Sequence, residues 1–421
     1  MSAYWPSPWP CEDGGPTRRQ TSRAGGGLGI SPDDHLEVTH RLAPLATMVV
    51  LRQPGEVFLL RHSAGDGAFS LVERIDPVTL EPLATSPELA GGPVWPGGLA
   101  AHANGSLYVI FGQHGHRLDD DLRVVASRQL PRAAPYNSFV VLPDGCLVTK
   151  DFAGSRPGVA VTASQRRRSE LIVLEPEHLE IVAALELPEP SIARLSCLAD
   201  AVYVVGDTSL LRVYWDGSAL RLDEGFRAGY RTLAGQTYGW DCVLTDGAAW
   251  CLDNGDGSER YTGTLRGHGI TSTPLHIVRV DTTSGAVSLT DVCGRPGGLV
   301  ANPPVVDELR RIVVGYDSGN GVLSAFHLGD DGTMTPNWRR DQNHASHLLL
   351  FTDTGELLTG DYDSARSAEQ AVVLDITTGK ELARADTGST VQSVLFPAPG
   401  FGRDCYTCSF TGVSRLSVTS S

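Results

Sequence analysis

The sequence has no long apolar run and no excess of positive charge. None of its hydrophobic stretches approaches the roughly 18 residues of a membrane-spanning helix. The 421 residues include 34 Lys and Arg against 49 Asp and Glu, a formal charge of −15, which argues against a protein held on nucleic acid or an anionic membrane by its net charge. The hydrophobic share of 41% excludes a largely disordered chain. We therefore expect a soluble protein with no nucleic-acid or membrane partner.

Residues 1–34 lack a basic stretch followed by an apolar one, so no secretory signal is visible. Eight cysteines are scattered along the chain, which without such a signal favours free thiols and a cytoplasmic location. Cys405 and Cys408 form a C-x-x-C pair in a segment typical of a strand, where positions i and i+3 point to opposite faces. No second C-x-x-C pair is present to complete a zinc site, so we interpret both as ordinary thiols.

Helical periodicity is almost absent, and short apolar runs alternate with turn signals such as PDG, TDG and DTG, which is typical of many short strands. One unit recurs: an apolar strand, a turn, and a second apolar strand that usually ends in a polar residue. Its eight copies span residues 47–62, 97–114, 137–151, 194–207, 240–253, 297–317, 346–361 and 392–410.

A different hairpin follows all but the last of these units, at residues 72–86, 117–130, 172–187, 212–226, 277–292, 324–338 and 372–387. Two hairpins make a four-stranded blade, and a repeat of about 40–50 residues indicates a β-propeller. The last unit is followed by a single strand at 412–418, whereas the first is preceded by an unassigned strand at 35–43. We predict an all-β, eight-bladed β-propeller of four-stranded antiparallel blades, closed by this N-terminal outer strand. The short second hairpin of blade two leaves seven blades as the alternative.

In this interpretation residues 35–421 form one propeller domain and residues 1–34 are a Pro/Gly-rich N-terminal extension. Deleting residues 1–43 would remove the closing strand and expose a sheet edge. Deleting only residues 1–30 is therefore expected to be far milder.

The hairpins IVRVDTTSGAVSLTDV (277–292) and VVLDITTGKELARADTG (372–388) resemble the repeats of the quinoprotein (PQQ-dependent) alcohol dehydrogenase-like propellers, which have eight blades. The resemblance extends to one hairpin type in most blades, and it implies the same fold across about residues 35–418. The tryptophan-docking motif and the vicinal cysteine pair of those dehydrogenases are missing, so PQQ is not an expected cofactor. The Gly-His…Trp-Asp signature of WD-repeat proteins is missing as well.

In a propeller the first strand of each blade starts at one mouth of the central channel, and the second strand returns to it. Polar residues collect at this mouth, together with long loops at 152–169, 254–274 and 362–370. Long loops on a rigid scaffold are where binding function tends to lie. The substrate-binding residues predicted from these positions are Arg61, His62, Asn137, Lys150, Arg194, Trp240, Tyr316 and His344.

For catalysis we predict acid–base groups among His347, Asp361, His114 and Asp241. His347 starts a hairpin that ends at Asp361, and paired positions across such a hairpin lie about 5 Å apart. A carboxylate beside an imidazole suits a general base near neutral pH.

One divalent metal ion, calcium, manganese or zinc, is the other candidate source of chemistry. Its predicted ligands are Asp151, Asp253 and Asp317, although a residue that recurs at one repeat position is equally suited to capping a loop. These features favour an enzyme acting on a small molecule at the mouth, a lactonase-like hydrolase or a lyase. The alternative is a non-catalytic propeller that binds a ligand or a protein.

Overall fold

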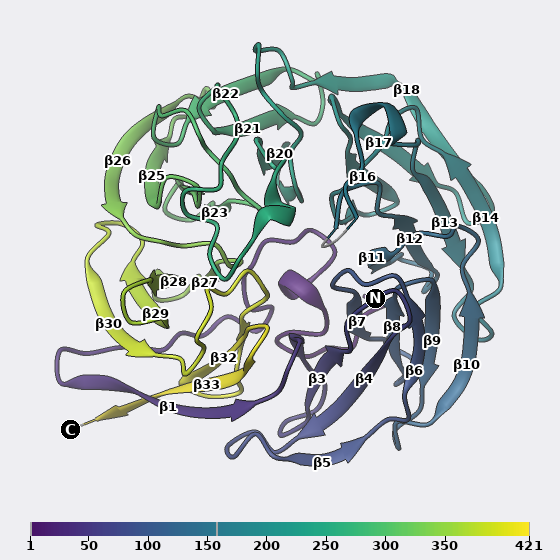
Figure 1. Cartoon of the computed structure of the whole chain (residues 1–421), viewed down its shortest axis with the longest axis horizontal. Coiled ribbons are helices and arrows are strands. Elements are labelled where there is room, and N and C mark those ends of the chain that lie inside the picture. The colour runs from purple at the N-terminus through teal and green to yellow at the C-terminus, as the bar shows by residue number, and fades with distance from the viewer. Residues whose placement is uncertain (1, 157–158, 421) are drawn as a thin grey trace.

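Eight antiparallel sheets surround a central channel in the computed structural model, which describes residues 2–156 and 159–420 (Figure 1). Each sheet is one blade, and the predicted eight-bladed propeller is confirmed. Blades one to four contain β2 (Ala46–Leu51), β3 (Val57–His62), β4 (Ala68–Ile75), β5 (Pro82–Thr85) and β6 (Leu89–Gly92); β7 (Gly98–Ala101), β8 (Leu107–Phe111), β9 (His114–Leu118) and β10 (Val124–Gln129); β11 (Tyr136–Val141), β12 (Leu147–Asp151), β13 (Glu170–Leu174) and β14 (Ile181–Glu186); and β15 (Ser196–Leu198), β16 (Ala201–Val205), β17 (Ser209–Trp215) and β18 (Leu220–Gly229).

In blade one β6 pairs with β4, beside β5, and in the remaining blades the strands are given in order from the channel outward. Blades five to eight contain β19 (Val243–Thr245), β20 (Ala248–Leu252), β21 (His276–Asp281) and β22 (Val287–Asp291); β23 (Val305–Asp307), β24 (Ile312–Asp317), β25 (Val322–Leu328) and β26 (Met334–Asp341); β27 (Leu349–Phe351), β28 (Glu356–Asp363), β29 (Ala368–Asp375) and β30 (Glu381–Asp386); and β31 (Ala398–Pro399), β32 (Asp404–Cys408), β33 (Gly412–Ser420) and β1 (Asp34–Leu42).

Helical structure in the described residues is limited to three 3₁₀ turns, η1 (Glu12–Gly14), η2 (Ala163–Gln165) and η3 (Ser258–Arg260). None of these turns has the length or the apolar character to cross a bilayer.

Burial explains the apolar runs of the first hairpin in each blade. Strands such as β8, β12, β16 and β20 are buried at every position, because the neighbouring blades cover both of their faces. Outer strands such as β10 and β14 alternate between exposed and half-buried residues, as expected for a sheet edge that faces water. Blade two is complete, since β9 and β10 pair from His114↔Gln129 to Leu118↔Val124.

Aspartates shape the turns of the second hairpins. Asp281 accepts hydrogen bonds from the backbone N–H groups of Thr283 (3.1 Å) and Ser284 (2.7 Å), and Asp375 does the same for Thr378 (2.8 Å). These are Asx turns. The need for an aspartate that accepts these backbone hydrogen bonds explains why the D-x-T-[ST]-G pattern recurs.

The ring is closed by its two terminal strands. β1 pairs with β33 in an antiparallel register that runs from Asp34↔Ser420 to Leu42↔Gly412. Blade eight therefore takes its inner three strands from the C-terminus and its outer strand from the N-terminus, and the two strands lie side by side in Figure 1.

The N-terminal segment before β1 lies across the middle of the ring, where Figure 1 shows it in purple. Trp9, Arg18, Gln20 and Leu28 are at most 1% exposed. The segment is therefore part of the propeller core. This burial overturns the physical basis for expecting a mild effect from deletion of residues 1–30.

The segment contacts every blade in turn, mostly at the ends of the innermost strands. Its backbone carbonyl groups accept hydrogen bonds from the backbone N–H groups of five blade residues: Leu51, Ala101, Cys197, Leu244 and Leu350. The Tyr4 hydroxyl accepts one from the Val141 backbone, and the Leu28 carbonyl oxygen accepts one from the Arg403 side chain. The Gln20 side chain donates one to the Pro304 carbonyl oxygen. We call the mouth where innermost strands end the lower mouth, and the mouth where they begin the upper mouth. The N-terminal segment lies along the lower mouth.

Candidate functional site

A cavity of about 480 Å³ opens at the upper mouth. Its lining comes from segments that precede innermost strands and from loops that follow second strands, including η3. Four of the predicted site residues line it: His62, Arg194, Trp240 and Asp241. The other predicted residues do not.

Aromatic rings form part of the cavity wall. Trp95 and Trp240 line it, and Phe152 stacks on Trp95 with ring centroids 4.4 Å apart. Trp95 and Trp240 are nearly parallel, with centroids 6.1 Å apart. Phe396 also lines the cavity, and the Arg194 guanidinium lies 4.7 Å from its ring centroid. Such walls suit a flat, apolar ligand surface.

Charged side chains from the N-terminal segment meet the blades beneath this cavity. Arg194 pairs with Glu12, and Arg18 donates to Glu12 (2.5 Å) and Asp13 (2.8 Å). Arg18 also donates to the Leu195 carbonyl oxygen (2.6 Å). All of these side chains are almost completely buried, so the ion pairs compensate one another away from water.

Asp13 occupies the centre of this network. Its backbone has a φ of 54°, a left-handed conformation that Asp tolerates better than most residues. The turn η1 places its carboxylate between Arg18 and His347, whose Nδ1 lies 2.8 Å from Asp13 Oδ1. Burial alone would raise the pKa of Asp13, but His347 and Arg18 outweigh that effect and hold the pKa below its usual value.

The carboxylate beside His347 is thus Asp13 rather than the predicted Asp361. Extending the register Leu349↔Leu358 places His347 opposite Gly360, so Asp361 falls on the other face of the strand. Asp361 instead accepts hydrogen bonds from Arg384 (2.8 Å) and the Asn343 backbone (2.9 Å). The expected distance across the hairpin was wrong because it ignored this one-residue offset.

Asp241 links the network to the cavity. It lines the cavity wall, and its Oδ1 accepts a hydrogen bond from the Arg194 backbone N–H at 2.6 Å. One ligand atom each of Asp13, Asp241 and His347 lies within 4.8 Å of the others. Within residues 2–156 and 159–420, this is the one such group of three or more His, Cys, Asp or Glu side chains.

The three aspartates predicted as metal ligands are not brought together. Asp151 accepts a hydrogen bond from the Glu170 backbone (2.7 Å), Asp253 from the His276 ring (2.7 Å), and Asp317 from Asn320 (2.8 Å). Each one holds the loop exit of its own blade.

Several predicted substrate-binding residues are held by nearby protein groups. Arg61 pairs with Glu73 (2.8 Å), Asn137 donates to the Ile192 carbonyl oxygen (3.0 Å), and Tyr316 donates to that of Ser346 (3.1 Å). None of these three residues lines the cavity.

A buried lysine, two buried histidines and the half-buried His114 remain to be placed. Lys150 donates to the carbonyl oxygens of Asp151 (3.2 Å) and Ser191 (3.1 Å), and burial lowers its pKa to about 7. Burial likewise lowers the pKa of His344 to about 4 and that of His62 below its usual value. The Nδ1 of His114 lies 2.7 Å from the Gly91 carbonyl oxygen.

The cysteines are all free thiols. Cys405 and Cys408 lie on β32 and are buried, which raises their pKa values. They form no disulfide.

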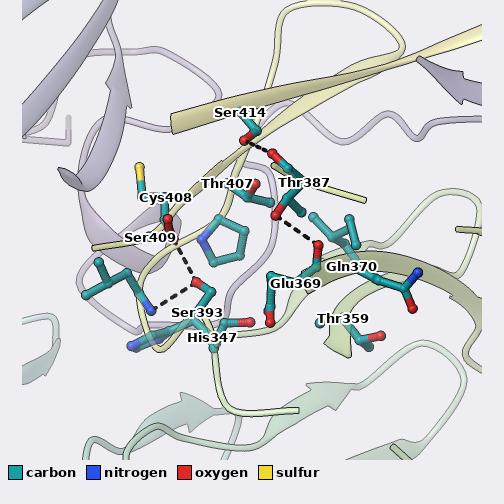
Figure 2. Close-up of a pocket in the computed structure, with 16 residues that line it drawn as sticks. His347, Thr359, Glu369, Gln370, Thr387, Ser393, Thr407, Cys408, Ser409 and Ser414 are labelled. Atoms are coloured by element: carbon teal, nitrogen blue, oxygen red, sulfur yellow. Dashed lines mark hydrogen bonds between the residues drawn. The ribbon is translucent and has the colours of Figure 1, made fainter. Parts of the chain in front are cut away.

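A second, much smaller cavity of about 20 Å³ lies between blades seven and eight (Figure 2). His347, Glu369, Thr387 and Ser393 are among the residues that line it. Glu369 is fully buried, its Oε2 has no hydrogen-bond partner, and burial raises its pKa well above the usual value. A cavity of this size holds about one water molecule.

Sequence reasoning missed Glu12, Asp13 and Arg18, as well as Trp95 and Phe396. The first three belong to a segment without repeats, so no repeat position marked them. The aromatic residues of the WPSPWP stretch are the signal that this segment is buried, and Trp9 is 1% exposed.

No family model matches this sequence, and no curated protein matches it. Solved structures do match. The quinohemoprotein alcohol dehydrogenase ADHIIG from Pseudomonas putida HK5 is 9% identical, with a TM-score of 0.62 over 99% of this chain and 80% of that one. The quinohemoprotein alcohol dehydrogenase from Comamonas testosteroni is 12% identical, with a TM-score of 0.62 over 98% and 81%. BamB from Moraxella catarrhalis is 12% identical, with a TM-score of 0.57 over 90% and 97%.

This chain shares their propeller fold. The resemblance to PQQ-repeat propellers is thereby confirmed at the level of the fold, and at these identities the similarity shows the fold alone.

Proposed function

We propose that the protein is an enzyme that acts on a small molecule in the upper-mouth cavity, as a hydrolase or a lyase. The observation that carries the proposal is a cavity of about 480 Å³ with aromatic walls that ends on the carboxylate of Asp241. Its volume lies in the range of ordinary ligand sites, which are largely apolar with a few placed polar groups.

The lining describes the expected substrate. Trp95, Trp240 and Phe396 favour a flat apolar or aromatic body, and Arg194, Asp241 and Asn302 favour a polar end that points toward the channel. Such a molecule would bury its apolar part against the walls and place its reactive group at the floor.

Asp241 is the group from which chemistry would start, since it lines the cavity while His347 and Asp13 lie beneath it. A carboxylate can remove a proton from water, as hydrolysis requires, or from carbon, as elimination requires.

PQQ has no place in this proposal. It carries three carboxylates on a flat quinone, whereas Asp66, Asp241 and Glu259 all line the cavity and would repel them. The cavity cations Arg156 and Arg194 are already paired with Asp66 and Glu12.

Binding is tested with Nile red, a neutral fluorescent dye with a flat aromatic body. Trp240→Ala should weaken its Kd about tenfold, the effect of losing about 1.4 kcal/mol of stacking and burial. Trp338→Ala is the matched control, because Trp338 lies on the outer strand β26. Equal dye affinity for both variants and the unmodified protein would show that the cavity is not the binding site.

Catalysis is tested with two chromogenic probes, para-nitrophenyl butyrate for hydrolysis and a β-(para-nitrophenoxy) ketone for elimination. Asp241→Asn should lower kcat by about 10²–10⁴ on the probe that is turned over. Asp307→Asn is the control, since Asp307 is another buried aspartate paired with an arginine. If the dye binds in the cavity and neither probe reacts, the enzyme proposal fails and a non-catalytic ligand-binding propeller remains.

A further inference from the structure

Three ligand-type side chains from distant parts of the chain meet beneath the cavity. Asp13 comes from η1, Asp241 from the segment before β19, and His347 from the segment before β27. Each is at most 2% exposed, and one ligand atom of each lies within 4.8 Å of the others. We infer that these residues bind one divalent transition-metal ion, zinc or manganese, at the floor of the cavity.

The imidazole of His347 provides the most direct support. Its Nδ1 lies 2.8 Å from Asp13 Oδ1, an ion-pair contact whose geometry is not that of a hydrogen bond, and this buried atom has no hydrogen-bond partner. The Nδ1 of His276 is equally buried and equally close to Asp253, at 2.7 Å, and there the hydrogen bond is formed. A buried ring nitrogen without a well-formed hydrogen bond is incompletely satisfied, and a metal ion shared with Asp13 would satisfy it.

The two carboxylates are prepared in the way that metal ligands usually are. Arg18 holds Oδ2 of Asp13 at 2.8 Å, and the Arg194 backbone N–H holds Oδ1 of Asp241 at 2.6 Å. One oxygen of each carboxylate thus remains for a ligand. Such outer partners orient the first ring of ligands around a metal.

The charges beneath the cavity favour a cation as well. Three carboxylates, those of Glu12, Asp13 and Asp241, face two guanidinium groups, those of Arg18 and Arg194. These five groups together carry one more negative than positive charge, and a bound cation would offset it.

The donor set selects the type of ion. Imidazole nitrogen is preferred by zinc and other transition metals, carboxylate oxygen is also accepted by manganese, and neither calcium nor magnesium favours nitrogen. Three protein ligands leave a coordination position free, as in catalytic zinc sites. Its use in polarising a substrate rests on the proposed function, whereas the binding of the metal does not.

Metal binding is measured on the full chain, first stripped with a chelator and then titrated calorimetrically with zinc chloride or manganese chloride. We expect one equivalent per chain for one of the two ions. His347→Gln and Asp241→Asn should each weaken the Kd by at least about 10–100-fold. His276→Gln and Asp307→Asn keep the unmodified affinity, because they alter a buried histidine and a buried aspartate outside the group.

X-ray absorption at the metal edge of the unmodified protein provides a second test that needs no variant. We expect one imidazole and oxygen ligands around the ion. Binding below 0.1 equivalent in both titrations, or a spectrum without imidazole, would overturn the inference; so would equal affinities for the site and control variants. If no metal binds but a probe is turned over, the metal site is wrong and the proposed function stands. If a metal binds but no probe is turned over, the metal site stands and the proposed function is wrong.

Discussion

The blades and the N-terminal segment differ in how their contacts are spaced along the chain. Apart from β1 with β33 in blade eight and β4 with β6 in blade one, strands that pair within a blade are neighbours in sequence, as in β27 and β28 or β28 and β29. The N-terminal segment contacts residues far away, for example Arg18 with Leu195 and Gln20 with Pro304. Local pairing produces a repeated pattern that can be recognised in the sequence, whereas long-range contacts made once do not.

The blades and the N-terminal segment also contribute differently to the candidate site. The blades supply a ring, a cavity and regular turns. The segment supplies Glu12, Asp13 and Arg18, which bring the charges of several blades together at one point. The part of the chain with the least repetition therefore contributes most to the character of the candidate site.

Removing the N-terminal segment should have the largest effect. A deletion of residues 1–32 keeps β1, so it separates the segment from ring closure. We expect this variant to lose its cooperative thermal unfolding. Truncating Trp9 alone to Ala would lower the free energy of unfolding by about 3–5 kcal/mol, and the deletion removes several other buried side chains as well. Calorimetry and size-exclusion chromatography measure the result. A melting curve like that of the intact chain would show that the segment is an accessory extension.

Breaking the charge network should cost somewhat less. Arg18→Met leaves Glu12 and Asp13 buried without their guanidinium partner, and we expect a loss of about 3–5 kcal/mol in the free energy of unfolding. Arg366→Met is the contrast within a blade, because the Arg366–Asp386 pair is exposed and such pairs contribute at most about 1 kcal/mol. Denaturant unfolding measures both. Equal losses in the free energy of unfolding for the two variants would show that the ion pairs of the N-terminal segment stabilise the protein no more than an exposed pair within a blade.

A buried histidine within blade seven should make stability depend on pH. His344 accepts a hydrogen bond from the Gly360 backbone N–H (2.8 Å), and burial lowers its pKa to about 4. Between pH 4 and 6.5 the unfolded chain binds the proton and the folded one does not, so stability rises with pH by up to about 3 kcal/mol. His344→Gln should flatten this part of the curve. An unchanged slope between the two proteins would contradict the prediction.

The smallest effect is expected at the rim of the cavity. Arg156 and Asp66 both line it and form an ion pair of 2.7 Å between loops of blades three and one. Asp66 is largely exposed, so Arg156→Ala should change the free energy of unfolding by less than about 1 kcal/mol. The free energy of dye binding can change by more than the free energy of unfolding. A large loss of stability would mean that these loops belong to the structural core.

Part of the candidate site could be located from the sequence, but its pairings could not. Arg194, Trp240 and Asp241 were identified because they stand just before an innermost strand, and that position does line the cavity. The partner of His347 was misassigned to Asp361, because side-chain direction depends on a register that turn lengths alone do not specify. Asp13 was not considered, because nothing in the sequence indicates which blade a non-repeating segment touches.

The amino-acid sequence by itself predicted eight blades, with seven as the alternative, together with the order of their strands and the closure of the ring by its N-terminal strand. It could do so because each of these features follows from alternating apolar strands and local turns, whose signals lie within a few residues of one another. Only the tertiary structure decided that residues before β1 line the lower mouth of the channel and that Asp13 meets His347 and Asp241. Those contacts join segments hundreds of residues apart, and they depend on how eight blades pack around one channel, which no local pattern encodes.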